Sequence, residues 1–510
     1  MALTLAELLA PWPELDVHGD RSARVTTVVE DSRAVVPGSV FVAVSGSGAD
    51  GHAFVPQALA AGAAAVVVET DRLAAIRAAL PDDHPVAWVT APCTRGLPAR
   101  LARESEGRPD TALTLVGVTG TNGKTTAAFL LQEALGALAG RCGLLGTIRY
   151  DDGRVRQAAP LTTPGGPVLY RWLARMRDAG CQTGAMEISS HALSQERPAD
   201  LALDAALLTN LGRDHLDYHA DMAAYRQAKL RILELLGGAR REKPPGVAVV
   251  NAADPAFDVV TNPHGATIRF AVDPAVAGAD LRVVDATLDL DGTRLLLDWR
   301  GRRLALASSL VGRYNVENLA AALAVLLGLG HDPEASAAAL GRAPQVPGRM
   351  ERVALPAGGL AVVDYAHTHD ALAAVLRACR ELVRGRLAVV FGCGGDRDRG
   401  KRPLMAGVAA RLADSAWITS DNPRSEDPAA IGAEVLAGFD ATPDRRATAC
   451  EVVVDRTAAI EAALADAGEG DVVVIAGKGH EDYQLVGDRT LHLDDREVVR
   501  DWLARHGDGQ

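Results

Sequence analysis

A glycine-rich stretch that ends in Gly-Lys-Thr, residues 117–126, gives the strongest indication of chemistry in this sequence. It follows an apolar run, 113–118, and precedes a helix-like segment, 125–138, so it is expected to form a strand-to-helix turn. In such a turn, backbone N–H groups at the helix start bind phosphate, the ammonium of Lys124 neutralises it, and the Thr125 hydroxyl can bind Mg²⁺. A glycine-rich turn with a solvated lysine is the alternative. Strand, Gly-Lys-Thr and helix together favour a site for a nucleoside triphosphate, although Val118 stands where the usual spacing has glycine.

Two further polar positions follow apolar strands in the same region. Glu187 lies in the expected strand 184–188, at the edge where a second oxygen ligand for Mg²⁺ belongs. The strand 205–208 leads into the dense polar run 209–219, which contains His215. A plain solvated loop is the less favoured interpretation of this run, because functional side chains gather on such loops. His215 is therefore a candidate metal ligand.

Lysine is scarce, since it occurs only at positions 124, 229, 243, 401 and 478 among 53 basic residues. Arginine cannot lose its proton or present a compact ammonium, so a retained lysine can mark chemistry that needs one or the other. Lys229 lies in the helical stretch 222–236 and, on sequence alone, a solvated lysine is the simpler interpretation. The sharper hypothesis is a buried neutral amine that adds CO₂ and binds metal as a carbamate. Lys243 is interpreted as an ordinary surface residue.

Four polar clusters in the last third of the chain each follow an expected strand. They occupy residues 364–370, 392–402, 420–424 and 476–482. The carboxyl ends of parallel strands meet at one edge of a sheet, where ligands bind in such folds. Any one cluster could be a solvated loop, but four in this position favour a ligand site.

The alternation of strands and helices predicts an α/β protein of about three domains, since domains commonly have ~100–200 residues. Residues 1–108 contain strands, turns and a helix at 55–61. Residues 109–346 predict a mostly parallel sheet, in which the period-two pattern of 266–309 indicates an antiparallel appendage. Residues 347–510 alternate strands with helices again.

Composition excludes several classes of protein. The net charge of -12 argues against general affinity for nucleic acid or acidic membranes. Six scattered cysteines without a C-x-x-C pair indicate neither a disulfide framework nor a zinc site. The sequence shows no secretory signal and no run of ~18 apolar residues, so a cytoplasmic protein without membrane insertion is expected.

Taken together, these motifs resemble the Mur ligases, the ATP-dependent amino-acid ligases of peptidoglycan precursor synthesis. The resemblance covers nearly the whole chain and rests on residues 31–33, 38, 41, 120–125, 187–191, 214–218, 229, 348–350 and 364–367 and on the three later clusters. It implies an α/β fold with the three-domain Mur ligase architecture. The domains would be a UDP-substrate domain (1–108), a central P-loop ATPase domain with a small antiparallel appendage (109–346), and a Rossmann-like amino-acid domain (347–510). His369 stands where this family is expected to have proline, which puts one loop shape in doubt.

The resemblance also implies a reaction. ATP would phosphorylate the γ-carboxylate of D-glutamate in UDP-N-acetylmuramoyl-L-alanyl-D-glutamate, and an amine of meso-diaminopimelate would attack the acyl phosphate. The signal for this amino acid is Asp421-Asn422-Pro423-Arg424. An arginine fork suits the second carboxylate of diaminopimelate, whereas it would repel the side-chain ammonium of lysine. The enzyme is expected to be a monomer that does not bind nucleic acid.

By the same resemblance, individual residues acquire expected roles. ATP would be held by Gly120, Thr121, Asn122, Gly123, Lys124, Thr125, Thr126, Asn315, Arg349 and Asp364. One Mg²⁺ would be held by Thr125 and Glu187, and a second by His215 and carbamylated Lys229, so that Lys124, Glu187, His215 and Lys229 would be catalytic. The UDP-muramoyl dipeptide would be held by Glu30, Ser32, Thr162, Thr163, Ser189, Gln195 and Arg197. Diaminopimelate would be held by Arg397, Asp421, Asn422, Pro423, Arg424, Gly477 and Glu481.

Two other functions are compatible with part of this pattern. Folylpolyglutamate synthase catalyses the same class of reaction, but it would not have the first 108 residues or the cluster 421–424. A P-loop switch or regulatory ATPase would need no arginine and glutamate clusters on a separate C-terminal sheet. Both features are present, so the sequence favours the amino-acid ligase.

Overall fold

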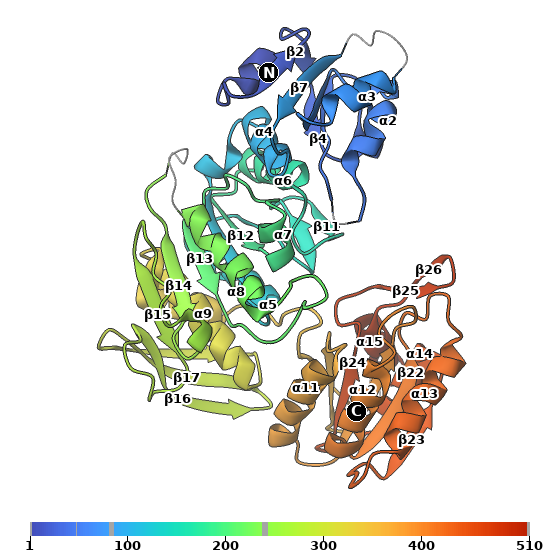
Figure 1. Ribbon diagram of the computed structural model, residues 1–510. Helices are drawn as coiled ribbons and strands as arrows, with labels where there is room; N and C mark the ends of the chain where they lie inside the picture. Colours follow the sequence, from blue (N-terminus) through green and yellow to red (C-terminus); the bar gives the residue numbers. More distant parts are fainter. Residues whose placement is uncertain (1–2, 47, 81–85, 237–242, 507–510) are drawn as a thin grey trace. The chain divides into compact units, whose positions relative to one another are not determined.

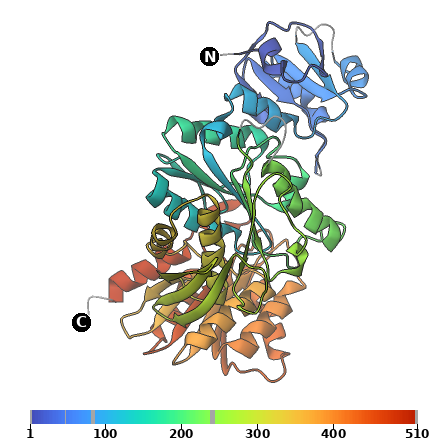
Figure 2. The ribbon, with the colours of Figure 1, turned by 90° about the vertical axis from the view of Figure 1, so that its left-hand side faces the viewer.

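The structure is a computed structural model that describes residues 3–46, 48–80, 86–236 and 243–506. The chain divides into two compact units, each of which is described by itself (Figure 1, Figure 2). The first unit comprises Met1–Val284, Leu297–Leu304 and Asn318–Leu340, and the second comprises Asp285–Leu296, Ala305–Glu317 and Gly341–Gln510. Among the described helices, none combines the length and the hydropathy that a membrane crossing requires.

The first unit begins with a five-stranded sheet in the order β2-β7-β6-β5-β4. Four of its strands are parallel, namely β4 (Thr27–Val29), β5 (Ser39–Val42), β6 (Ala65–Glu69) and β7 (Ala87–Ala91), and β2 (Asp16–His18) is antiparallel to β7. The valines of β6 are fully buried, as expected for a strand covered on both faces. The remaining elements are β1 (Leu3–Thr4), β3 (Arg24–Val25), α1 (Leu5–Leu9), α2 (Val55–Ala60), α3 (Leu73–Ala78) and α4 (Leu97–Ser105).

A larger sheet of eleven strands follows, in the order β11-β10-β9-β12-β8-β13-β14-β15-β16-β17-β18. Near its middle, β8 (Thr114–Thr119) lies parallel to β12 (Thr183–Glu187) and β13 (Ala205–Leu208), so these strands end at one edge. The helix α5 (Lys124–Ala139) begins just after β8. The other elements here are β9 (Cys142–Leu145), β10 (Arg149–Asp151), β11 (Arg156–Ala158), α6 (Gly166–Asp178), α7 (Ser190–Ser194), α8 (Met222–Leu230), the 3₁₀ helix η4 (Arg231–Leu236), β14 (Val247–Asn251), α9 (Arg313–Gly328) and α10 (Pro333–Gly341).

The expected appendage, residues 266–309, instead continues the large sheet as β15 (Thr267–Ala271), β16 (Leu281–Asp289), β17 (Gly292–Trp299) and β18 (Arg302–Ser308). At its start the pairing is parallel and not antiparallel, because β15 pairs in parallel with both β14 and β16. The two segments on which the prediction of an appendage rested, 293–298 and 303–307, lie in β17 and β18, which are neighbours in the sheet and are joined by the turn Arg300-Gly301. Alternation along β17 shows that one face of the strand is exposed, whereas the parallel pairing of β15 could not be read from it.

The second unit contains a six-stranded sheet in the order β19-β20-β24-β21-β22-β23. The strands β20 (Leu360–Asp364), β24 (Val472–Ala476), β21 (Leu387–Cys393), β22 (Ser415–Ser420) and β23 (Ala449–Val452) are parallel, and β19 (Glu351–Ala354) is antiparallel to β20. One face packs on α11 (His369–Leu382), α12 (Lys401–Leu412) and α13 (Pro428–Asp440), and the other on α14 (Arg456–Ala465) and α15 (Asp495–His506) (Figure 1). A hairpin, β25 (Tyr483–Val486) and β26 (Arg489–His492), completes the unit. The four polar clusters therefore follow neighbouring parallel strands, as the sequence predicts.

His369, which replaces the expected proline, is the first residue of α11. The helix begins normally because the Thr368 side chain accepts a hydrogen bond from the Ala371 N–H. The first helical position tolerates proline, since its N–H has no partner within the helix, but it does not require proline. The histidine therefore preserves the start of this helix.

A buried ion pair supports the face of the C-terminal sheet that α14 and α15 cover. Arg456 Nε and Nη2 each lie 2.7 Å from a carboxylate oxygen of Asp495, and neither side chain is exposed. Replacing Asp495 by alanine would leave the buried guanidinium without its counter-charge, so the free energy of unfolding is expected to fall by about 3–5 kcal/mol. Urea unfolding followed by tryptophan fluorescence, to which Trp417 in β22 and Trp502 in α15 contribute from this unit, would measure this loss.

The control is Glu381→Ala, which removes one partner of the exposed Arg313–Glu381 pair in the same unit. This change is expected to cost less than about 1 kcal/mol, because solvent screens exposed ion pairs. A shift for Asp495→Ala no larger than that of the control would contradict the importance assigned to the buried pair.

Candidate active site

The glycine-rich loop after β8 has a conformation that only glycine permits at its key positions. Gly120 has φ 152°, and a Cβ atom at this residue would lie 1.8 Å from Thr209 Oγ1. Gly123 has φ 83° and precedes the first turn of α5. The loop is anchored to the end of β13, since the Asn122 N–H donates to Asn210 Oδ1 at 2.8 Å. These contacts position a row of backbone N–H groups at a helix start, which is suitable for binding phosphate.

Lys124 places a positive charge at the same point. Its Nζ donates to the carbonyl oxygens of Gly120 and Thr121, each at 2.8 Å. The ammonium is thus held against the loop at the positive end of the α5 dipole, and the two effects together favour an anion there.

Thr125 and Glu187, the predicted ligands of one Mg²⁺, lie in contact. The Thr125 hydroxyl donates to Glu187 Oε2 at 2.9 Å, and Glu187 is almost fully buried. A hydroxyl and a carboxylate are oxygen ligands of the kind that Mg²⁺ prefers, so the two residues fit this ion.

Thr147 belongs to the same group of side chains and was missed by sequence reasoning. Its N–H donates to Glu187 Oε1 at 2.6 Å and its hydroxyl to Glu187 Oε2 at 3.1 Å. The residue follows β9, which pairs with β12, so only the strand order brings it to Glu187. A threonine just after an expected strand is the weak signal that could have identified it.

Lys229 is a buried lysine and not a solvated one, since only 1% of the residue is exposed. Its Nζ donates to the Gly120 carbonyl at 2.7 Å and lies 4.4 Å from the centre of the Tyr225 ring. Burial, together with the nearby charge of Lys124, lowers the pKa of Lys229 to about 6. The amine is therefore largely neutral at pH 7 to 8, which is the form that can react with CO₂.

His215, the other predicted ligand of the second metal, adopts a left-handed backbone with φ 53°. Its ring lies edge-on to His191 at 4.8 Å and 6.0 Å from the ring of Tyr225, which also contacts Lys229. Strained backbone of this kind is concentrated at functional sites, because the surrounding structure must hold it in place.

Four of the residues expected to hold the UDP-muramoyl dipeptide form one hydrogen-bonded group. Arg197 donates to the Thr163 carbonyl at 2.9 Å and to Gln195 Oε1 at 2.7 Å and 3.0 Å. The Ser189 N–H donates to Thr163 Oγ1 at 3.0 Å, and the Thr163 hydroxyl donates to the Glu187 carbonyl at 2.9 Å. The group is therefore joined directly to the strand that carries Glu187.

The remaining three residues of this set are placed differently. Thr162 lies 3.1 Å from Thr147, oxygen to oxygen, and so joins the group around Glu187. Glu30 lies beside Gly165, in the loop that also contains Thr162 and Thr163, since a Cβ atom on Gly165 would lie 2.0 Å from Glu30 Oε1. Ser32 instead donates to Gln57 Oε1 at 2.9 Å within the N-terminal sheet region.

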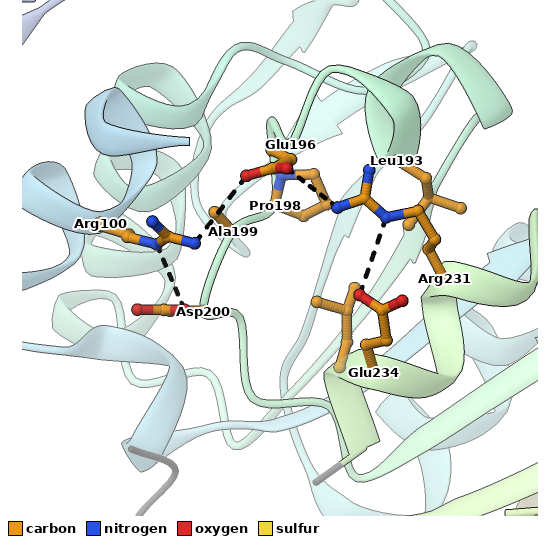
Figure 3. Close-up of a pocket in the computed structure, with 9 residues that line it drawn as sticks. Arg100, Leu193, Glu196, Pro198, Ala199, Asp200, Arg231 and Glu234 are labelled. Atoms are coloured by element: carbon orange, nitrogen blue, oxygen red, sulfur yellow. Dashed lines mark hydrogen bonds and ion pairs between the residues drawn. The ribbon is translucent and has the colours of Figure 1, made fainter. Parts of the chain in front are cut away.

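A cavity of about 100 Å³ lies along the segment 193–200, and several charged side chains line it (Figure 3). Glu196 pairs with Arg231 at 3.1 Å and with Arg100 at 3.9 Å, so it connects α4 with η4. Next to Glu196 in the chain are Gln195 and Arg197, which are predicted to bind the UDP-muramoyl dipeptide and which do not line the cavity. The cavity therefore marks a network that supports this loop and is not the predicted site itself.

In the second unit, Asp364 ends β20 with its carboxylate buried. It accepts hydrogen bonds from the N–H groups of Met350 and Ala366, at 2.8 Å and 2.9 Å. Burial raises the pKa of Asp364, while the charge of Arg349 opposes that shift. Asn315, the third residue of this predicted ATP group, is buried and donates to the Val311 carbonyl at 2.8 Å.

The cluster 421–424 lies against the loop after β21. Arg424 has φ 52° and donates from Nη1 to the Gly395 carbonyl at 2.9 Å. A Cβ atom on Gly394 would lie 2.9 Å from Arg424 Nη1 and 3.8 Å from Arg397 Cγ, so the two arginines flank this glycine. The Arg424 N–H and Asn422 Oδ1 also bond to the backbone of Leu485, which ties the hairpin β25–β26 to the cluster.

The other predicted residues of the amino-acid site adjoin this cluster. Asn422 Nδ2 donates to Glu481 Oε2 at 3.4 Å, and a Cβ atom on Gly477 would lie 3.8 Å from Asp421 Oδ2. The Pro423 carbonyl accepts a hydrogen bond from the Glu426 N–H at 3.0 Å, which closes a turn over residues 423–426 just after Asn422. The structure therefore brings the predicted residues of this set to one edge of the C-terminal sheet.

Lys243 contradicts its interpretation as ordinary surface. Its side chain is only 8% exposed and pairs with Asp204 at 2.6 Å. Asp204 also accepts a hydrogen bond from the Leu115 N–H, so the pair fixes the start of β8. This burial could not be predicted from the pattern along the chain, because Asp204 lies 39 residues away from Lys243.

Comparison with known proteins agrees with this arrangement. Residues 118–326 match the Mur ligase middle domain, residues 348–479 match the Mur ligase glutamate ligase domain, and residues 24–103 match the Mur ligase family catalytic domain. The chain belongs to the Mur ligase family.

Individual relatives match over nearly their whole length. UDP-N-acetylmuramoyl-L-alanyl-D-glutamate–2,6-diaminopimelate ligase of Gloeobacter violaceus is 44% identical over 505 residues, which cover 99% of each chain. The protein of the same name from Geobacillus kaustophilus is 40% identical over 99% of this chain and 100% of its own. A solved structure of a ligase with that name is 32% identical, with a TM-score of 0.69 and coverage of 99% and 100%.

Proposed function

We propose that this chain is an ATP-dependent ligase that joins meso-diaminopimelate to the D-glutamate γ-carboxylate of UDP-N-acetylmuramoyl-L-alanyl-D-glutamate, a step of peptidoglycan precursor synthesis. The observation that carries this proposal is the identity of 39–44% to relatives of that name over at least 95% of this chain. The two groups of side chains described above supply the chemistry that the reaction needs.

The reaction has two steps. An oxygen of the D-glutamate γ-carboxylate attacks the γ-phosphorus of ATP, and the bond to ADP breaks to give an acyl phosphate. A neutral amine of diaminopimelate then attacks the acyl carbon, loses a proton and expels phosphate, which leaves an amide. The protein contributes mainly orientation and neutralisation of charge in such transfers. Lys124 and the N–H groups of residues 120–126 supply this neutralisation at the phosphate.

Individual residues would bind the nucleotide and the metal ions. Asn315, Arg349 and Asp364 would meet adenine, phosphate and ribose respectively. Thr125 and Glu187 would hold one Mg²⁺, and His215 with carbamylated Lys229 would hold a second. When bound, these ions neutralise phosphate charge and orient the oxygens that react.

The acceptor and the amino acid would be held at separate groups. Thr162, Thr163, Ser189, Gln195, Arg197, Glu30 and Ser32 would hold the UDP-muramoyl dipeptide. Arg424 would bind the distal carboxylate of diaminopimelate and Glu481 the ammonium beside it, with Arg397, Asp421, Asn422, Pro423 and Gly477 completing the pocket. We further propose domain limits of 1–108, 109–346 and 347–510, a monomer, and a cytoplasmic location.

Phosphate release tests the proposed function. The full chain is mixed with ATP, Mg²⁺ and UDP-muramoyl-L-alanyl-D-glutamate, and either meso-diaminopimelate or L-lysine is added. Release is expected to depend on the dipeptide and to be faster with diaminopimelate. A rate of phosphate release that does not change when either amino acid is added would contradict the proposed ligase activity. A faster rate with lysine would contradict the role given to Arg424.

A further inference from the structure

Lys478 is a buried lysine that the proposed reaction leaves without a role. It follows β24, and its side chain is 0% exposed. An ammonium group removed from water is stable only when charged or polar groups surround it closely. The identity of those groups therefore indicates what this lysine does.

The groups around Lys478 are those proposed to bind the amino acid. Its Nζ lies 3.5 Å from Asp421 Oδ1, 3.6 Å from Glu481 Oε2 and 3.3 Å from Asn422 Oδ1, to which it donates a hydrogen bond. Asp421 Oδ1 is buried and, within the described part of the chain, accepts no hydrogen bond. The positive charge of Lys478, 3.5 Å away, therefore stabilises this oxygen.

Lys478 also determines the orientation of the Asn422 amide. Asn422 Oδ1 accepts from both Lys478 Nζ and the Leu485 N–H, the latter at 2.9 Å. The amide nitrogen must therefore point the other way, and it donates to Glu481 Oε2 at 3.4 Å. Without the ammonium, the amide would lose one of two donors that distinguish its oxygen from its nitrogen.

Lys478 offsets part of the negative charge in this group. Asp421 and Glu481 carry two negative charges, and Lys478, which lies near both carboxylates, carries a positive charge in addition to those of Arg397 and Arg424. Arg456, which also lies near, is already neutralised by Asp495. The distal end of diaminopimelate bears one ammonium and one carboxylate, so its site must accommodate both charges. Without Lys478 the site would be more negative by one charge, which would shift its preference toward an end that bears an ammonium alone, as in lysine.

We propose that Lys478 is a positioning and specificity-determining residue, which holds Asp421, Asn422 and Glu481 in place and offsets one carboxylate, so that the site prefers a zwitterionic amino-acid end to a purely cationic one. The inference rests on the proposed function, since it concerns how that reaction selects its amino acid. A purely structural lysine would make a different prediction, because its loss would weaken the use of both amino acids equally.

The test compares kcat/KM for meso-diaminopimelate and for L-lysine in the full chain and in Lys478→Met, at saturating ATP and dipeptide. The variant is expected to lower the ratio of the two values at least about tenfold, chiefly through KM for diaminopimelate, while KM for ATP stays within about twofold. Asp421→Asn combined with Lys478→Met restores the net charge of the unaltered site and is expected to recover part of the ratio. An equal loss for both amino acids would overturn the proposal.

The matched control is Lys243→Met, which removes another buried, ion-paired lysine in the first unit. It is expected to reduce stability and to leave the ratio unchanged. If Lys478→Met does not fold, as judged by circular dichroism, Asp421→Asn alone tests the same balance. That variant makes the site less negative by one charge and is expected to raise the ratio, so an unchanged or lower ratio overturns the proposal. If the unaltered chain releases phosphate without regard to either amino acid, the proposed function itself has failed.

Discussion

Replacing Lys124 by methionine is expected to lower kcat about 100- to 1000-fold, the range seen when one preorganised group that stabilises transition-state charge is removed. The Lys124 ammonium is fixed on the phosphate loop by the carbonyls of Gly120 and Thr121. Methionine fills similar space but carries no charge, so the transferring phosphate would lose this compensation. Phosphate release at saturating ATP, dipeptide and diaminopimelate would measure the effect.

The loop should survive this substitution, because other contacts hold it. The Thr121 N–H donates to the Asn210 carbonyl at 2.8 Å, and Thr209 Oγ1 donates to the Asn122 carbonyl at 2.6 Å. An unchanged thermal unfolding curve would show that the loss is chemical. Lys124→Arg, which keeps the charge but not the compact ammonium, should retain more activity than Lys124→Met. A methionine variant with more than a tenth of the original kcat would contradict the assigned role.

Replacing Lys229 by alanine is expected to lower kcat about 100-fold or more, and short carboxylates such as acetate or propionate should restore part of it. The pKa of Lys229, lowered to about 6, makes its amine available to CO₂ near neutral pH. The resulting carbamate would be an anion between the Gly120 carbonyl and Tyr225, where the lysine lies now. Alanine leaves a space that a free carboxylate can enter.

Lys229→Met provides the matched control for this rescue. Methionine occupies most of the space that alanine leaves, so added carboxylate should find no room and activity should stay low. Rates would be measured across a series of carboxylate concentrations for both variants. Full activity of the alanine variant without additive, or equal responses of the two variants, would show that Lys229 does not act as a carbamate.

The sequence predicted the elements around the site well, because long apolar runs determine them. The strand expected at 205–208 is β13, and the helix expected at 125–138 is α5, Lys124–Ala139. The convergence of the four C-terminal clusters also followed from sequence, since parallel strands end at a common edge.

Features that depend on the order of the strands could not be predicted. Thr147 reaches Glu187 only because β9 pairs with β12, and Lys243 is buried only because it meets Asp204. The burial of Lys478 likewise depends on three residues contributed by two loops. In each case the pattern along the chain shows the residue but not its partner. The domain limits and the roles of individual residues remain predictions.

If Arg424 binds the amino acid as proposed, its left-handed backbone limits which residues could replace it during evolution. With φ 52°, position 424 disfavours β-branched side chains such as valine, isoleucine and threonine, whereas asparagine and glycine fit easily. The carbonyl of the hairpin residue Leu485 fixes this conformation by accepting a hydrogen bond from the Arg424 N–H. Few single substitutions at position 424 would therefore be available to a lineage that acquired a new substrate. Other substitutions there would require the hairpin to change together with the arginine.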